Sequence, residues 1–291
     1  MGTRTAFYID EKANELCGLS ATKKRRKVIV AETRHTYRIS GKDVALEVYA
    51  DGAGPALVVL PSYGRGAAED FDFFANTLSA AGFKVLRPQP RGIAGSKGKM
   101  EGLSLHDQAD DVALVIRELS DGKAVVLGHA FGHGVAKTVA ADYPSLVTGV
   151  IVAAAQCSSV SPEIERTPHQ ACDLKAPVEE RLAALRKGFF APNHDATIWL
   201  NGWYPETMQM QVSSVGRTAA DEFSRAGNAP LLEIIPDSDP FKPRPYWGEL
   251  RQQLGDRVTT EIIADASHAL FPEQPQRVAA MTIEWYRRLI S

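Results

Sequence analysis

Wholly apolar runs alternate with helical patterns along most of the chain. The runs at 56–60 and 125–127 contain no polar residue, which is typical of strands buried on both faces of a sheet. A hairpin signal at 41–43 joins two earlier runs. The pattern predicts strands at 36–39, 44–49, 56–60, 84–87, 125–127, 147–153, 230–235 and 258–263, and helices at 67–80, 105–119, 135–141, 246–254 and 275–289. This alternation predicts an α/β fold with a mostly parallel central sheet of about eight strands and helices on both faces.

The alternation stops between residues 157 and 227, where helices are predicted only at 179–187 and 219–225. We interpret 157–227 as a helical cap inserted over the sheet. Aromatic and methionine side chains are dense within it, and they would either line an apolar ligand site or pack the cap onto the core. These residues are Trp199, Trp203, Tyr204, Met208 and Met210.

The predicted domains follow from these changes of pattern. Residues 1–35 form an N-terminal extension, 36–156 the first part of the core, 157–227 the cap and 228–291 the second part of the core. The extension contains the basic run Lys23–Lys27, which is either a solvated edge or a nuclear-import or anion-binding signal.

Composition narrows the function classes. The chain has 291 residues and a formal net charge of −2, so no overall field indicates a nucleic acid or a membrane as partner. No apolar run approaches the ~20 residues of a membrane span. The cysteines Cys17, Cys157 and Cys172 have neither paired nor metal-ligand spacing, so we expect a cytoplasmic protein, with a nuclear location as the alternative that Lys23–Lys27 leaves open.

The segment that follows the run at 125–127 carries the most specific chemistry. Gly128 and Gly132 have the spacing of the G-x-S-x-G nucleophile elbow, a strained strand–turn–helix in which a serine hydroxyl stands above a sheet. The serine position is Ala130, whose methyl group has no lone pair and cannot attack a substrate. The glycines do not have dinucleotide-site spacing, and no phosphate loop or metal cluster is visible, so no cofactor and no metal are expected.

Four segments, which follow one another in the family's order, resemble the α/β-hydrolase superfamily over about 36–291. They are the loop Pro61-Ser62-Tyr63-Gly64, where the family more often has His-Gly-x, the segment 90–96 with its Arg-Gly-x-x-Gly-Ser sequence, the elbow at 128–132, and Asp239 followed by His268. The family's order is serine, acid, histidine. The resemblance implies an α/β-hydrolase fold with a cap and a catalytic site at the carboxyl edge of the sheet.

The resemblance also implies the role of each site residue. His268 would be the general base and Asp239 would orient its imidazole, with Asp237 as the competing acid. Backbone N–H groups of Phe131 and Tyr63 would form the oxyanion hole. The side chains expected to contact the substrate are Ser62, His129, Trp199, Trp203, Tyr204 and Met208.

Ala130 leaves the reaction open. If it replaces a serine, the protein is an esterase or lactonase for an apolar small molecule, made inactive by the exchange. If alanine is native, His268 and Asp239 could serve lyase, cyclisation or direct water-activating chemistry, or the pocket could bind a small molecule without turnover. Cys157 and Ser62 are weaker substitute nucleophiles, since neither lies on the elbow. Hydrolysis is the first hypothesis, and a homodimer is left open.

Overall fold

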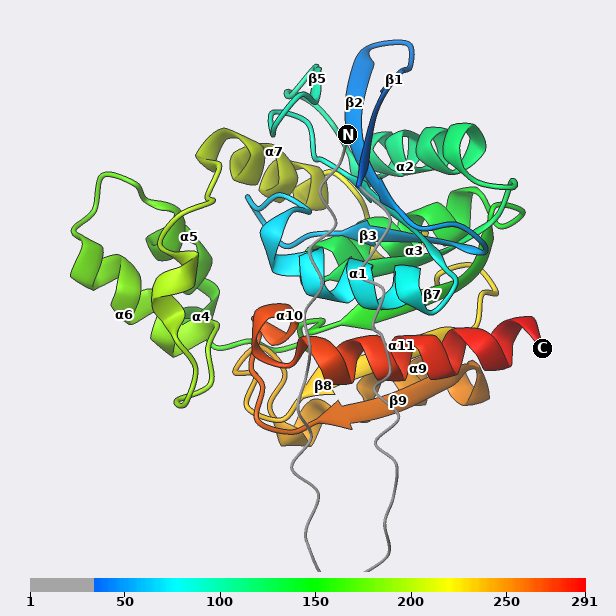
Figure 1. Ribbon diagram of the computed structural model, residues 1–291. Coiled ribbons are helices and arrows are strands. Elements are labelled where there is room, and N and C mark those ends of the chain that lie inside the picture. The colour runs from blue at the N-terminus through cyan, green and yellow to red at the C-terminus, as the bar shows by residue number, and fades with distance from the viewer. Residues whose placement is uncertain (1–33) are drawn as a thin grey trace, which may run out of the picture.

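A single mixed sheet organises the molecule (Figure 1). The computed structural model describes residues 34–291, so Lys23–Lys27 and nearly all of the predicted extension lie outside the described residues. Within 34–291 nine strands form one sheet. They are β1 (His35–Ser40), β2 (Val44–Asp51), β3 (Ala56–Leu60), β4 (Lys84–Pro88), β5 (Lys97–Gly98), β6 (Ala124–His129), β7 (Val147–Ala153), β8 (Leu231–Pro236) and β9 (Val258–Ile263).

The strand order is β1-β2-β4-β3-β6-β7-β8-β9, with the short β5 paired to β2. β2 is antiparallel to its neighbours β1, β4 and β5, and all other pairs are parallel. The prediction of a mostly parallel sheet of about eight strands is confirmed. The additional strand β5 has two residues in a glycine-containing loop, which is too short for any hydrophobic period to reveal.

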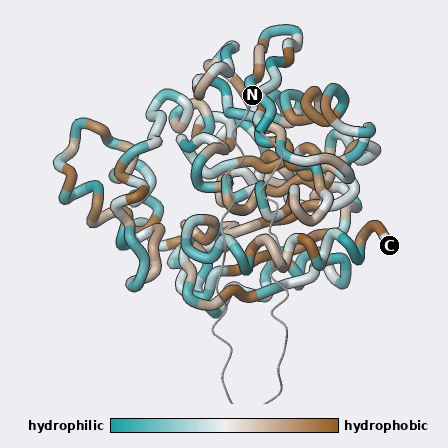
Figure 2. The backbone as a smooth tube through the Cα atoms, in the orientation of Figure 1, coloured by the Kyte–Doolittle hydropathy of each residue, from teal (hydrophilic) through white to brown (hydrophobic). Residues whose placement is uncertain are grey.

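Helices cover both faces of the sheet, as predicted. Along β3, Val58 faces the core shared with α2 and α3, whereas its neighbours Leu57 and Val59 face the core shared with α1 and α11. This two-residue alternation explains why the central strands are apolar throughout, and Figure 2 shows the hydrophobic colour concentrated there. The core helices are η1 (Glu69–Phe71), α1 (Asp72–Ala80), α2 (Leu105–Leu119), α3 (Gly132–Asp142), η3 (Arg244–Tyr246), α9 (Glu249–Leu254), η4 (Gly255–Arg257), α10 (Leu270–Glu273) and α11 (Pro275–Ile290).

The chain between β7 and β8 is helical and irregular. Figure 1 shows α4, α5 and α6 standing apart from the sheet, with α7 nearer to it. The elements are α4 (Pro162–Glu165), α5 (Thr167–Cys172), α6 (Val178–Gly188), η2 (Ala196–Trp199), α7 (Pro205–Gly216) and α8 (Ala220–Phe223). The sequence did not predict α4, α5 or α7. It predicted a helix at 219–225, which is three residues longer than the observed α8.

Helix α7 was missed for a physical reason. It has a weak amphipathic pattern, and its sequence ends in Ser-Ser-Val-Gly, residues with poor helix propensity. Met208, Met210, Gln211 and Ser214 are buried against the rest of the molecule. The helix is therefore stabilised by tertiary contacts and not by the intrinsic helix propensity of its residues.

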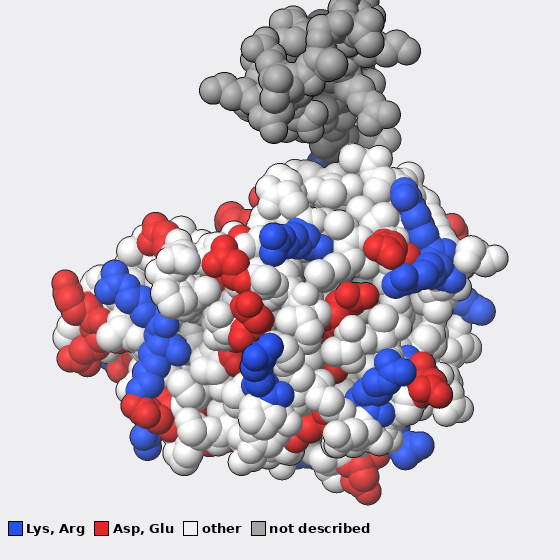
Figure 3. Space-filling view, turned by 90° about the horizontal axis from the view of Figure 1, so that it is seen from below, with Lys and Arg blue, Asp and Glu red and all other residues white. Residues whose placement is uncertain are grey.

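Charge is distributed without a dominant sign on the face that Figure 3 displays. Lysine and arginine side chains lie interspersed with aspartate and glutamate there. In the part of the chain that the structure describes, no helix combines the length and apolar character needed to cross a membrane.

Candidate active site

The elbow is formed by the junction of β6 and α3. Ala130 lies between them with φ +48°, a conformation that L-residues rarely adopt. Its N–H donates to the Ala153 carbonyl at 2.9 Å, and its own carbonyl accepts from the His133 N–H at 2.9 Å. The strand–turn–helix predicted around residue 130 is therefore present, with its strained residue at the position where a nucleophile would stand.

Both elbow glycines are required by close backbone contacts. A Cβ atom on Gly128 would lie 2.2 Å from the Gly132 carbonyl oxygen, and one on Gly132 would lie 2.5 Å from the Leu60 carbonyl oxygen. Backbone cannot move aside as a flexible side chain can. The G-x-x-x-G spacing is thus a packing requirement of the turn.

We expect Gly132→Ala to lower the free energy of unfolding by about 3 kcal/mol, because the new methyl group would displace the end of β3. Urea denaturation measures the difference. Gly216→Ala at the end of α7 is the matched control, since a Cβ there meets nothing within 4 Å. That control should be neutral or slightly stabilising. Equal stability of the two variants would contradict the packing argument.

His268 and Asp239 form a buried pair beside the elbow. His268 Nδ1 lies 3.0 Å from Asp239 Oδ2 and 3.2 Å from Oδ1. Asp239 is 3% exposed and His268 5%. Asp239 Oδ1 also accepts from the Phe241 N–H at 2.9 Å, which fixes the carboxylate. Asp237, the competing acid, is exposed and accepts a hydrogen bond from the Ser238 hydroxyl. The acid that contacts His268 is Asp239.

The loop carrying His268 is held from several sides. Glu273 accepts hydrogen bonds from the Ser267 and Ala191 N–H groups, both at 2.6 Å, and the Ala269 N–H donates to the Phe189 carbonyl at 2.8 Å. Burial raises the pKa of Glu273, and these two N–H donors oppose that rise. The loop therefore joins the end of the sheet to the α6 region.

His129 has a positioning role toward the same loop. Its Nε2 lies 2.7 Å from the His268 carbonyl oxygen. Burial, reinforced by the nearby His268, lowers the pKa of His129 to about 3. The ring is therefore neutral, and its Nε2–H donates to the carbonyl. His129 does not line the cavity at Ala130, which corrects the expectation that it contacts a substrate.

Tyr63 and Phe131 supply two backbone N–H groups in this region. Within residues 34–291, the N–H groups of Tyr63 and Phe131 donate to no protein acceptor. The rings of the same two residues stack at 4.6 Å, and burial raises the pKa of Tyr63 to about 12, so its hydroxyl stays protonated. The next residue, Gly64, is fixed by α7: its N–H donates to Gln211 Oε1 at 2.7 Å, and its carbonyl accepts from the Tyr204 N–H at 2.8 Å.

A cavity of about 380 Å³ opens at the elbow. Ala130, His268, Tyr63 and Phe131 line it together with Ser62. The rest of the wall is mostly apolar, with the polar residues His133, Gln156, Glu165 and His169 among its members. It includes Leu105, His133, Gly134, Gln156, Glu165, Pro168, His169, Phe189, Trp203, Met208, Val212, Val215, Phe223 and Phe241.

Only part of the predicted cluster of aromatic and methionine side chains lines the elbow cavity. Trp203 and Met208 line the cavity, but Trp199 and Tyr204 do not, which corrects the expectation for those two. Trp199 is 1% exposed and donates from Nε1 to Asp70 at 3.0 Å, with the Arg65 guanidinium over its ring. Trp199 packs the segment between β7 and β8 against Asp70 and Arg65, whereas Tyr204 is 39% exposed.

The lining residues Phe189 and Phe241 escaped sequence reasoning. Phe189 and Phe241 pack against the His268 ring, with centroids 5.5 Å and 4.3 Å away. His133 donates to the Ala130 carbonyl, and burial, with Lys137 as the next cause, lowers its pKa to about 3. The place of His133 at the start of the helix, directly after Gly132, indicates that it could line the pocket. No local signal distinguished the two phenylalanines.

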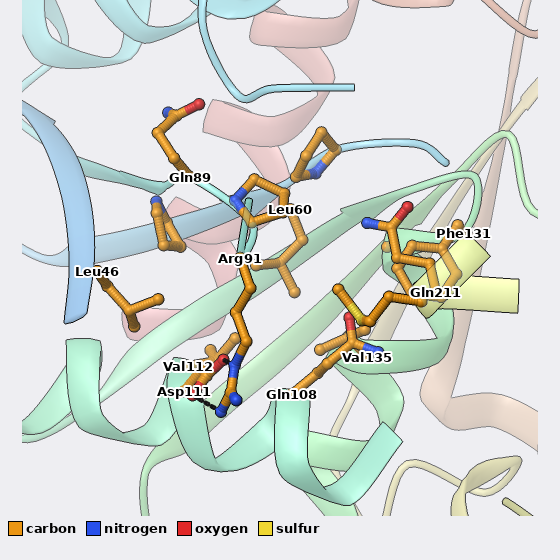
Figure 4. A pocket seen from close by; sticks show the side chains of 15 residues that line it. Leu46, Leu60, Gln89, Arg91, Gln108, Asp111, Val112, Phe131, Val135 and Gln211 are labelled. Carbon is orange, nitrogen blue, oxygen red and sulfur yellow. Dashed lines mark hydrogen bonds and ion pairs between the residues drawn. The ribbon is translucent and has the colours of Figure 1, made fainter. Parts of the chain in front are cut away.

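Phe131 also lines a second cavity of about 50 Å³ (Figure 4). There Arg91 forms a two-point ion pair with Asp111, at 2.7 and 2.8 Å. The Gln108 amide nitrogen is buried without a partner among the described residues. The pair secures the loop that begins at Arg91 to α2. This cavity lies apart from His268, which is not among its lining residues.

Residues 34–291 contain no group of three or more histidine, cysteine or acidic side chains arranged to hold a metal ion. Cys157 donates to the Ser159 carbonyl at 3.3 Å and lines neither the elbow cavity nor the one beside Arg91. Of the two weaker nucleophile candidates, Ser62 alone reaches the elbow cavity.

Comparison with known proteins identifies relatives. Residues 55–192 match the family model described as alpha/beta hydrolase fold. A 2-(acetamidomethylene)succinate hydrolase of Mesorhizobium japonicum is 32% identical over 108 residues, which cover 37% of this chain and 38% of that relative. A pyrethroid hydrolase of Sphingobium wenxiniae is 26% identical over 243 residues, covering 74% of this chain and 81% of the relative. A thermophilic esterase from Thermogutta terrifontis has the same fold, with a TM-score of 0.71 at 20% identity over 89% of this chain and 100% of that one.

Proposed function

We propose that this chain, whose residues 55–192 match the alpha/beta hydrolase fold model, is a hydrolase of that superfamily whose site is arranged for carboxylic esters or lactones of apolar small molecules, with Ala130 at the nucleophile position. One observation carries this proposal. His268, paired with Asp239, lines a single cavity at the elbow together with Tyr63 and Phe131, whose N–H groups donate to no acceptor among residues 34–291. Two relatives are named as hydrolases, and a protein of the same fold as an esterase, which supports the reaction class.

The geometry supports a division of roles. Asp239 engages Nδ1 of His268, which leaves Nε2 to take a proton from the attacking group and return it to the leaving group. The N–H groups of Tyr63 and Phe131 would stabilise the oxyanion of a tetrahedral intermediate. A serine at position 130 would form an acyl-enzyme that water then cleaves. With Ala130, no acyl-enzyme can form at this position, because the methyl group cannot attack a carbonyl carbon.

The wall of the cavity supports an apolar substrate. Phe189, Trp203, Met208, Val212 and Phe241 supply aromatic and aliphatic surface next to Ala130. Such a wall binds an acyl chain or ring by removing apolar surface from water. Glu165 and His169 belong to the cap side of the cavity, where a polar end of the ligand would remain near solvent.

Binding to the alanine-containing chain tests the substrate class, because esters that are not cleaved can be titrated at equilibrium. We expect affinity to rise along a p-nitrophenyl ester series from acetate to octanoate. Trp203→Ala should weaken octanoate binding about tenfold through loss of buried apolar contact. Tyr204→Ala is the matched control, since Tyr204 lies outside the cavity. Affinity independent of acyl length, or equal losses in both variants, would count against an apolar site.

Ala130 itself favours a second candidate, base catalysis without a protein nucleophile. Turnover by the alanine chain that disappears in His268→Ala would support lyase, cyclisation or water-activating chemistry. Tight binding without turnover, in both the alanine chain and its Ala130→Ser variant, would instead support a binding protein.

A further inference from the structure

Three buried charged side chains form a cluster away from the elbow. Lys137 comes from α3, Glu233 from β8, and Lys242 from the loop after β8. Lys242 Nζ and Glu233 Oε1 are 2.5 Å apart, and both residues are almost fully buried. Glu233 Oε2 has one further contact, 3.5 Å from the Thr260 hydroxyl. Lys242 and Glu233 thus neutralise each other, and Lys137 is left as the excess amine.

Lys137 has no such partner. It is 9% exposed, and among the residues that the structure describes its Nζ makes no hydrogen bond or ion pair. The side chain lines a cavity of about 150 Å³, which we call the Lys137 cavity. The space can hold a molecule of a few heavy atoms. Gln156 lines both this cavity and the elbow cavity, so the two are neighbours.

The surroundings favour the uncharged form of this amine. Burial, and then the positive charge of Lys242, lower the pKa of Lys137 to about 8, while Glu233 acts in the opposite direction. A lysine amine that is desolvated and next to another cation is an established route to nucleophilicity. The other titratable groups near it are Glu249 and Cys157 in the cavity wall and His133 on α3.

We propose that Lys137 is a covalent site for small aldehydes and ketones, which it binds as an imine inside the Lys137 cavity. The neutral Nζ adds its lone pair to the carbonyl carbon, and the carbonyl π electrons move to oxygen. Transfer of protons from nitrogen to that oxygen releases one water molecule and leaves a C=N bond. No oxidant or reductant is needed. The site uses neither Ala130 nor His268, so it does not depend on the proposed ester hydrolysis.

Reductive trapping tests this on the full chain. The protein is incubated with propanal and cyanoborohydride at pH 7.5, and the rate of alkylation of each lysine is measured by peptide mass spectrometry. We expect Lys137 to react about tenfold faster than the exposed Lys97, because burial and the charge of Lys242 enlarge the neutral fraction of Lys137. Lys242, held by Glu233, should react more slowly than Lys137. Alkylation of Lys137 no faster than that of Lys97 would overturn the proposal.

The variant Lys242→Met tests whether Lys137 is alkylated because its amine is nucleophilic or only because propanal can reach it. Lys242→Met removes the neighbouring cation and frees Glu233 to pair with Lys137, so alkylation of Lys137 should fall several-fold while that of Lys97 stays unchanged. Circular dichroism confirms that the variant is folded, and if it is not, the pH profile of Lys137 alkylation in the unaltered chain gives the same information. A profile with the midpoint of Lys97, or an unchanged rate in folded Lys242→Met, would refute the proposal.

Discussion

Ala130→Ser should raise kcat/KM for p-nitrophenyl esters by a factor on the order of 10³ or more over the chain with alanine. The elbow already adopts the required backbone, with φ +48° at residue 130, and His268, Tyr63 and Phe131 line the same cavity. The substitution therefore adds a hydroxyl to a cavity that already contains the proposed base and the two residues of the proposed oxyanion hole. Initial rates on short and long acyl esters measure the gain.

The control for this gain is the double variant Ala130→Ser with His268→Ala. It should return to the rate of the alanine chain, because a serine without its base is a weak nucleophile. Mass spectrometry should also detect an acyl-enzyme on Ser at position 130 in the single variant. A serine variant that binds esters tightly yet shows neither turnover nor an acyl adduct would refute ester hydrolysis at this site.

Asp239→Asn, introduced into the Ala130→Ser background, should lower kcat by about 10³- to 10⁴-fold with little change in KM. The carboxylate holds His268 by Nδ1 at 3.0 Å, so an amide there would favour the wrong tautomer and would not stabilise the imidazolium. Steady-state kinetics with one ester at fixed pH measure the effect.

Asp237→Asn is the matched control for this loss. Asp237 is two residues away in the same loop, but it is exposed and does not contact His268. Its variant should keep activity within about twofold of the parent. If the two aspartates contributed equally, the assignment of Asp239 as the orienting acid would be wrong.

Much of the core could be predicted from the sequence, because strands that are buried on both faces of a sheet consist almost entirely of apolar residues. The strands β3 and β6 are wholly or largely apolar, so their place in the centre of a parallel sheet follows from composition alone. Ser104 caps α2 and Asp107 completes a capping box there, as local side-chain chemistry predicts. Such features depend only on residues that are close in sequence, or on the regular spacing of hydrophobic residues along a strand or helix.

The candidate site was only partly predictable. Asp239 and His268 follow the chain order of the family, and the structure brings them together. Trp199 and Trp203 are four residues apart and chemically alike, yet only Trp203 reaches the cavity. The Trp199 indole instead donates to Asp70, which lies about 130 residues earlier in the chain. Distant partners of this kind leave no local signal.

The attachment of α7 to Gly64 has a consequence for how the cavity opens. Gln211 and the Tyr204 backbone hold the residue immediately after Tyr63 by two hydrogen bonds. If α7 moved outward to admit a large ligand or release a product, both bonds would break, and the Tyr63 amide would lose its fixed direction. A substitution that loosens this attachment, such as Gln211→Ala, would therefore also loosen the loop that carries the proposed oxyanion donor Tyr63.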